Sequence, residues 1–197
     1  MIEYDFFSER LCIGERVKGG TYKPCAQVLP YSKIRGSFKE YAGVEVDGFG
    51  IITSISNTGH ITISPRDRLT DTARLPIKVM YLEGVTGKVF IREDRGLYYC
   101  LEKEFSFFMG GLKMKGFGRS RVKNKKAFAV KEKDTQNKGI LGTRIPVDKA
   151  ELFGIEVLKE RLGYLFVPHD EETGTYVLSY FEGSLIKGPQ FLIKGED

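Results

Sequence analysis

The 197-residue chain has no tryptophan, two histidines and three cysteines, and these scarcities limit the chemistry open to it. Cys12, Cys25 and Cys100 are far apart and no pair has CxxC spacing, so neither a zinc site nor a disulfide framework is indicated. We therefore expect no metal, no cofactor and a reducing, cytoplasmic setting. No window holds the roughly 18 apolar residues of a membrane span, and the mixed, acidic N-terminus is unlike a signal peptide. We expect no membrane partner.

The two histidines are weak candidates for catalysis. His60 lies in a predicted turn and His169 beside the acidic sequence HDEETG, and no catalytic partner stands near either one in sequence. Both are interpreted as solvated turn residues. His60 is the candidate that an enzyme hypothesis would need, because it is the histidine of the N-terminal region.

Positive charge is concentrated in residues 110–133, GGLKMKGFGRSRVKNKKAFAVKEK. This segment has nine Lys or Arg residues and one acid, Glu132, which gives it a net charge of +8. The rest of the chain has 22 basic and 25 acidic residues, so the segment accounts for the whole surplus of +5. A charge focused in this way predicts a polyanionic partner, because clustered Lys and Arg gain most by releasing counterions from phosphates.

The sequence pattern of the N-terminal two-thirds of the chain predicts alternating strands and helices. Alternation predicts a first strand, a loop containing Lys18 and Lys23 follows, and a helix begins near Ser32 and ends at Gly43. The further predictions are a hairpin of strands 49–56 and 60–64 around a turn at 57–59, strands 76–82 and 85–92, a second helix carrying Leu97, Leu101, Phe105 and Phe108, and a strand at 119–130. This order predicts an α+β fold with a ferredoxin-like, RRM-like domain over residues 1–133.

The remaining third of the chain is predicted to form a small β-rich extension. Residues 134–142 are interpreted as a linker and residues 143–197 as a β-rich C-terminal region. Within it we expect a short helix at 148–153 and strands at 163–167, 176–181 and 190–193.

The glycine-rich sequence at the start of the basic segment departs from three known phosphate-binding or RNA-binding patterns. Gly111 and Gly116 have P-loop spacing, but Phe117 and Gly118 stand where Lys and Ser/Thr are needed. A dinucleotide fingerprint fails because Arg121 occupies its last glycine position. Residues 115–118 copy the opening of RNP1, but the aromatic positions that should follow are basic or small. ATP, dinucleotides and an aromatic RRM platform are therefore not predicted.

The same sequence suits a clamp on an RNA backbone. Glycines allow amide N–H groups to reach phosphate oxygens, and Lys and Arg side chains add charge and forked donors. Phe117 either wedges against a base or sugar or packs under the loop. The candidate RNA-binding residues here are Gly110, Gly111, Lys113, Lys115, Gly116, Phe117, Gly118, Arg119, Arg121 and Lys123.

Three motifs resemble the CRISPR-associated RAMP superfamily, the RRM-fold proteins that hold guide RNA, and most closely its type III effector subunits. GGLKMKGFGRSRV after a helix resembles the family's glycine-rich loop. LPYSKIRGSF resembles its other signature, which opens the first helix, and VTGKVFI resembles the strand before the second helix. The likeness covers residues 1–133.

The resemblance implies a subunit that binds guide RNA (crRNA) and contacts other effector subunits. It implies that Ser32, Lys33 and Arg35 grip phosphate at a helix N-terminus, although Ser32 is also a simple N-cap candidate. Lys18 and Lys23 in the preceding loop join this set.

The resemblance also bears on catalysis. RNA-cleaving type III subunits carry an Asp in the loop after the first strand, where this chain has only Glu15. We therefore expect a non-catalytic crRNA-binding subunit. One alternative is a metal-independent endoribonuclease that processes precursor crRNA with His60 as its base. Another is a structural β-rich protein whose basic patch meets an acidic protein.

Overall fold

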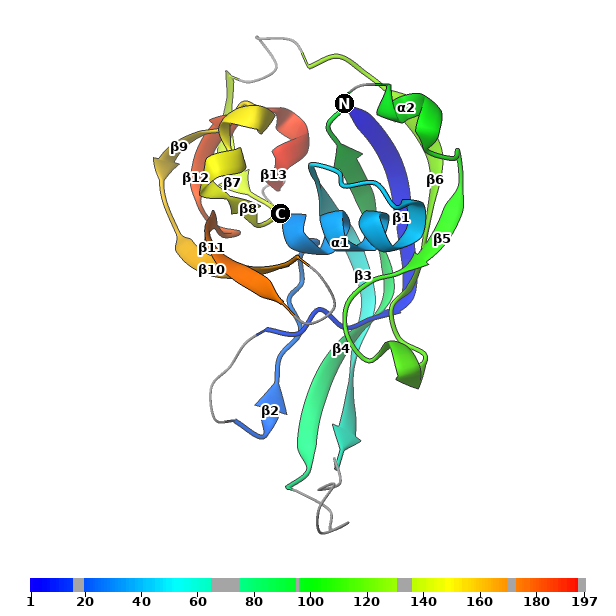
Figure 1. Ribbon diagram of the computed structural model, residues 1–197. Coiled ribbons are helices and arrows are strands. Elements are labelled where there is room, and N and C mark those ends of the chain that lie inside the picture. The colour runs from blue at the N-terminus through cyan, green and yellow to red at the C-terminus, as the bar shows by residue number, and fades with distance from the viewer. Residues whose placement is uncertain (16–19, 65–74, 95, 131–135, 170–172, 195–197) are drawn as a thin grey trace.

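The computed structural model describes residues 1–15, 20–64, 75–94, 96–130, 136–169 and 173–194, and the strands of these residues form three sheets (Figure 1). The first sheet has the order β2-β4-β1-β6-β5, with β3 also paired to β4. All its pairings are antiparallel except that of β2 with β4. Its strands are β1 (Ile2–Leu11), β2 (Tyr22–Lys23), β3 (Gly48–Ile63), β4 (Ile77–Ile91), β5 (Phe105–Phe108) and β6 (Arg119–Ala127).

Helix α1 (Tyr31–Ala42) covers one face of this sheet. The even-numbered residues of β1 from Ile2 to Ser8 are buried on this side, and the Tyr4 and Phe38 ring centroids are 6.4 Å apart. The helix ends at Gly43, as predicted, with the left-handed φ of 67° that a glycine adopts without steric cost. Its N-cap is Pro30, and Ser32 is buried inside the first turn, so the prediction of a Ser32 N-cap is wrong.

The predicted hairpin around residues 57–59 is also wrong. Strand β3 continues straight through these residues, and its partner along its whole length is β4, which itself joins the two predicted strands 76–82 and 85–92 into one. A Cβ at Gly59 would lie 2.4 Å from the Tyr81 ring on the opposite strand. Gly59 therefore makes room for a cross-strand tyrosine rather than for a turn.

The second predicted helix is reduced to one turn, α2 (Leu97–Cys100). The residues that should have continued it form strand β5, in which Phe105 and Phe107 are buried while Ser106 and Phe108 are exposed. This period of two, and pairing with β6, show that the phenylalanines are spaced for a sheet. The predicted strand at 119–130 is present as β6.

The C-terminal region is β-rich, as predicted. One sheet has the order β10-β11-β8, and another the order β13-β7-β12-β9. Their strands are β7 (Asn137–Leu141), β8 (Ile145–Pro146), β9 (Glu156–Lys159), β10 (Leu162–Pro168), β11 (Gly174–Tyr180), β12 (Leu185–Gly188) and β13 (Ile193–Lys194).

Three details of this region differ from expectation. Strand β7 lies within the predicted linker 134–142, so these residues are sheet rather than linker. The predicted helix at 148–153 consists of two 3₁₀ turns, Val147–Lys149 and Glu151–Phe153. The strand predicted at 190–193 is a 3₁₀ turn, Gln190–Leu192, that leads into β13. The division of the chain into the two predicted units stays a prediction.

A second apolar core joins the C-terminal region to the first sheet. Phe90 stacks on Phe191 at 4.8 Å between ring centroids, and Phe49 meets Phe153 edge-on at 5.0 Å. Phe49 and Phe90 lie opposite each other on the sheet face that points away from α1. The C-terminal region therefore covers one end of this face.

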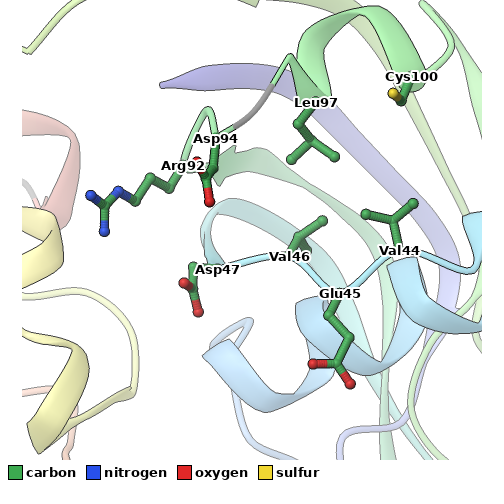
Figure 2. Close-up of a pocket in the computed structure, with 8 residues that line it drawn as sticks. All are labelled: Val44, Glu45, Val46, Asp47, Arg92, Asp94, Leu97 and Cys100. Atoms are coloured by element: carbon green, nitrogen blue, oxygen red, sulfur yellow. The ribbon is translucent and has the colours of Figure 1, made fainter.

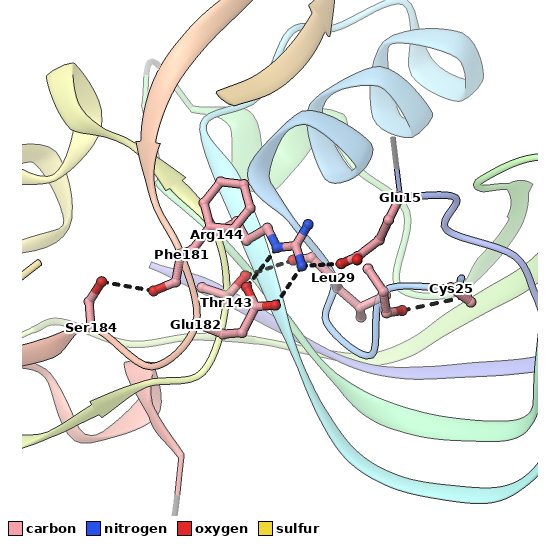
Figure 3. Close-up of polar contacts among 9 residues, drawn as sticks. Glu15, Cys25, Leu29, Thr143, Arg144, Phe181, Glu182 and Ser184 are labelled. Atoms are coloured by element: carbon pink, nitrogen blue, oxygen red, sulfur yellow. Dashed lines mark hydrogen bonds and ion pairs between the residues drawn. The ribbon is translucent and has the colours of Figure 1, made fainter. Parts of the chain in front are cut away.

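Arg144 lies at the centre of the polar contacts across this junction (Figure 3). Its Nε donates to Glu182 at 2.6 Å, and its Nη2 donates to the carboxylates of Glu182 and Glu15. Its guanidinium carbon lies 4.3 Å from the centroid of the Phe181 ring. The side chain is 10% exposed, so removing it would leave two carboxylates without their buried counter-charge.

We expect Arg144→Ala to lower the free energy of unfolding by about 2–3 kcal/mol, at or below the ~3–5 kcal/mol of a fully buried broken ion pair, because both carboxylates reach solvent. Urea denaturation measures this loss. Arg10→Ala is the control, because Arg10 is 59% exposed and 4.0 Å from Glu83. Equal losses in the two variants would contradict the role of Arg144.

Candidate nucleic-acid interface

The glycine loop (residues 110–118) connects β5 to β6 and folds against the end of β1. Gly110 and Gly118 have φ values of 84° and 82°, in the left-handed region. A Cβ at Gly110 would lie 2.3 Å from the Cys12 carbonyl oxygen, and one at Gly118 would lie 2.2 Å from the Met109 carbonyl oxygen. Both positions therefore require glycine for the loop to fold.

Several amides of the loop are bonded inside the protein. The N–H of Gly111 donates to the Cys12 carbonyl and that of Gly118 to the Arg10 carbonyl, each at 2.7 Å, and that of Gly116 donates to Lys113 at 3.0 Å. These amides are occupied by hydrogen bonds within the protein. The glycines therefore shape the loop, and its charge comes from side chains.

Phe117 lies beneath the loop. Its side chain is 4% exposed, and its ring meets the Tyr81 ring edge-on at 4.8 Å between centroids. Of the two alternatives for this residue, packing under the loop is the one found.

The loop also reaches α1. Lys113 forms an ion pair with Glu40, and the Ser37 hydroxyl donates to the Phe108 carbonyl oxygen at 3.2 Å. Burial lowers the pKa of Lys33, and the charge of nearby Lys113 lowers it further. Two predicted RNA-binding residues that are far apart in sequence, Lys33 and Lys113, thus come together.

Arg35 lies on the other side of α1, where an acid already holds it. Glu45 accepts from Arg35 and, at 2.8 Å, from Lys39, and these contacts lower its pKa to about 2. Arg35 and Lys39 line a cavity of about 580 Å³ between α1 and β10, together with Ser32, Gly36, Glu40, Val167, Pro168 and His169. A Cβ at Gly36 would be 3.9 Å from its nearest neighbour, an ordinary contact with Pro168, so Gly36 is not required by internal crowding.

Strand β6 carries its basic residues to the opposite face of the sheet. Arg119, Arg121 and Lys123 are exposed and alternate with buried residues. Arg121 pairs with Phe7 and Lys123 with Asp5, the odd-numbered side of β1 that faces away from α1. The predicted set therefore divides between the helix-covered face and this second face, which we call the open face.

The remaining predicted residues lie elsewhere. Lys18 falls outside the described residues. Lys23 is on β2, which is separated from β6 by β4 and β1. His60 is within β3, with its ring centroid 5.9 Å from that of Tyr22, and the His169 Nε2 is 2.5 Å from the Thr175 hydroxyl. Among the described residues no three His, Cys, Asp or Glu side chains are grouped as metal ligands.

Two relevant features were missed by sequence reasoning. Lys39 shares Glu45 with Arg35, and only its helical spacing from Arg35 could have suggested this. Phe7 is 42% exposed on the open face. The alternation of β1 could have indicated its orientation, because buried Tyr4 and Phe6 have the opposite parity.

A separate pocket of about 310 Å³ lies between the loop after α1 and the start of α2 (Figure 2). Val46 and Leu97 form its apolar wall, and Glu45, Asp47 and Asp94 are the acids around it. Asp47 accepts from the Tyr31 hydroxyl and lies 3.3 Å from Lys149. This surplus of acids is unsuited to a phosphate, so the pocket is not part of the basic surface.

Comparisons with known proteins support the fold. No family model matches the sequence, and no curated protein sequence matches it. A chain in the cryo-EM structure of the type III-B Cmr-beta bound to cognate target RNA and AMPPnP (state 1) aligns with a TM-score of 0.61 and 10% identity, over 95% of this chain and 86% of that one. A chain in the structure bound to cognate target RNA alone aligns with a TM-score of 0.59 and 9% identity, over 93% and 86%.

The protein thus has a mixed α/β fold that is similar to the folds of chains in the type III-B Cmr-beta structures. The resemblance to type III RAMP proteins that the sequence motifs indicated is confirmed at the level of the fold. No helix among the described residues is long and apolar enough to cross a membrane.

The glycine loop yields a matched pair of variants. Gly116 and Gly118 have φ values of 80° and 82°, but a Cβ at Gly116 has open space around it. We expect Gly116→Ala to lower the free energy of unfolding by about 1 kcal/mol, the cost of left-handed alanine. Gly118→Ala should cost about 3 kcal/mol because the Met109 carbonyl must also move. Equal losses in urea denaturation would contradict the close packing of Gly118.

Proposed function

We propose that this protein is a non-catalytic subunit of a type III CRISPR effector complex, and that it binds the crRNA backbone through its glycine loop and basic strand. The observation that carries the proposal is that the glycine loop, bonded to the end of β1, leads directly into β6, where Arg119, Arg121 and Lys123 are exposed. Clustered cations of this kind gain most by releasing counterions from phosphates. Lys33 and Lys113 add positive charge beside the loop, and Glu40 pairs with Lys113 there.

The topology of the first sheet supports a ferredoxin-like core. Strands β3, β4, β1 and β6 are neighbours in that order and antiparallel, with α1 between β1 and β3 in sequence and α2 between β4 and β6. This is the arrangement of a split βαβ domain. Its second helix is the single turn α2, and β5 extends the sheet beyond β6.

The described surroundings of the histidines support a non-catalytic role. His60 contacts an aromatic ring and His169 a threonine hydroxyl. His60 lies within β3 of the first sheet, whereas His169 follows β10 in the C-terminal region. General acid–base cleavage of RNA needs positioned groups that act together on one reacting phosphate. We therefore favour binding over cleavage.

Contact with neighbouring subunits has a suitable surface in the β10–β11 hairpin. Register pairs place Leu162, Tyr164, Phe166, Tyr176 and Leu178 on one face, and each is at least 42% exposed. Residues 162–180 contain no Lys or Arg. An uncharged apolar face of this kind is typical of protein interfaces and lacks the charge that RNA requires.

Binding of single-stranded RNA over a salt series tests the proposal. We expect log Kd to change with log salt by about 0.7 per phosphate contact, and Lys113→Ala with Lys115→Ala to reduce this slope by about 1.4. Arg119→Ala with Arg121→Ala should act similarly. The control is Lys138→Ala with Lys187→Ala, which removes two charges from the C-terminal sheet. A flat salt response in the native protein would overturn the proposal.

Glu45 provides a second test, because it occupies Arg35 and Lys39. We expect Glu45→Gln to raise RNA affinity a few-fold by releasing both cations. Glu156→Gln is the matched control, since it removes the same charge from an ion pair with Lys187 at 3.6 Å. Equal effects of the two substitutions would mean that only net charge matters, and that Arg35 and Lys39 do not contact RNA.

A further inference from the structure

The open face of the first sheet presents an aromatic ring at its centre. Phe7 lies on β1, which is flanked by β4 and β6, and is 42% exposed although a phenylalanine on a central strand is usually covered. Its register partners are Thr86 on β4 and Arg121 on β6. The ring therefore stands on a solvated sheet surface with an arginine beside it.

The neighbours of Phe7 are small and polar. Beyond Thr86 the next strand presents Ser54 and Thr53, whose hydroxyls lie 2.8 and 3.3 Å from the Thr86 hydroxyl. In the other direction Ser106 on β5 pairs with Arg121. None of these side chains is bulky enough to cover a phenylalanine ring.

A second ring lies on the same face. Phe108 on β5 is 45% exposed and pairs with Arg119. Only β6 separates its strand from that of Phe7, so the two strands are about 10 Å apart. The arginines of β6 thus run between two exposed rings.

The exposed cations of this face lie in one row beside Phe7. Arg119, Arg121 and Lys123 project from β6. Two acids of the face are in ion pairs, Glu3 with Lys88 at 2.5 Å and Glu104 with Arg121 at 3.5 Å. Asp5 accepts from the neutral Asn124 amide at 2.7 Å, and Glu9 lies near the end of β1. The Arg121–Glu104 pair is more than half exposed on both sides, so a phosphate can replace it at little cost.

We propose that the open face is a base-stacking platform for single-stranded RNA, with Phe7 at its centre and Phe108 at its edge, and with Arg119, Arg121 and Lys123 on the phosphates. Aromatic rings beside basic side chains bind single-stranded nucleic acid with little sequence preference, because every base has a π-face. The platform begins at Gly118, where the glycine loop enters β6. It ends where the C-terminal region covers Phe90.

The inference rests on the proposed function and deepens it, because it assigns a second RNA-binding surface that holds bases as well as phosphates.

Phe166 shows which features define the platform. Phe166 is 43% exposed, nearly the same as Phe7, but no Lys or Arg occurs in residues 162–180 around it. Exposure alone therefore does not define the platform; the ring and the adjacent arginines do.

The experiment measures affinity for single-stranded oligouridine over a salt series, using the full-length chain. We expect Phe7→Ala and Phe7→Leu each to weaken binding about tenfold with an unchanged salt slope, because a base stack is lost and no phosphate contact is. Phe7→Tyr should retain binding. Phe166→Ala, the matched control, should leave it unchanged. An oligonucleotide containing 2-aminopurine should lose fluorescence on binding to the native protein and less so on binding to Phe7→Ala.

Each outcome is decisive. If the native protein binds no RNA, the proposed function fails. If it binds, and Lys113→Ala with Lys115→Ala weakens binding while Phe7→Ala does not, the platform is overturned and the proposed function stands. If Phe7→Leu binds RNA as tightly as the native protein does, residue 7 makes an apolar contact with RNA and no base stack, and the inference is wrong. Because the Phe7 side chain is partly exposed, unfolding is checked by circular dichroism and by the retained salt slope.

Discussion

The contact between the glycine loop and the end of β1 determines how the basic residues of this protein are arranged. Gly111 and Gly118 donate to the Cys12 and Arg10 carbonyls, and at Gly110 the two backbones approach too closely for a side chain. Because β1 is a central strand, a loop fixed to its end can be reached from both faces of the sheet. Lys113 is brought to α1 on one face, while β6 carries its arginines across the other. One backbone contact thus distributes a single charged segment over two surfaces.

Elements with purely local signals could be predicted from the sequence, and elements decided by distant partners could not. Strand β1 follows from its alternation and the end of α1 from Gly43. Gly59 sits in a sequence that is typical of a turn, but the Tyr81 ring across the strand is what requires a glycine there. Likewise Phe105 and Phe108 have helical spacing, and it is the pairing of these residues with β6 that makes them a strand. In both cases the deciding contact is made by residues far along the chain.

The candidate site shows the same division. The charged residues of the site could be predicted from the sequence, because charge depends only on residue type. The residues that pair with them could not be predicted. Glu40 on Lys113 and Glu45 on Arg35 are products of the fold, and they reduce the free positive charge that the sequence suggests. The orientation of Phe7 follows from the parity of β1, but whether its face is open depends on where the C-terminal region lies. That region covers Phe90 on the same face and leaves Phe7 exposed.

Charge, rather than exposure, separates the two aromatic surfaces of this protein. Phe7 and Phe166 expose similar fractions of similar rings, so the hydrophobic gain on covering either is similar. Electrostatic attraction between exposed groups is screened within about 8 Å at physiological ionic strength, so only adjacent charges distinguish the two rings. Phe7 has Arg121 as its direct register partner, whereas Phe166 is paired with Tyr176. Under the proposed function, a polyanion is therefore expected at the first sheet rather than at the β10–β11 hairpin, and the hairpin is the surface proposed for protein partners.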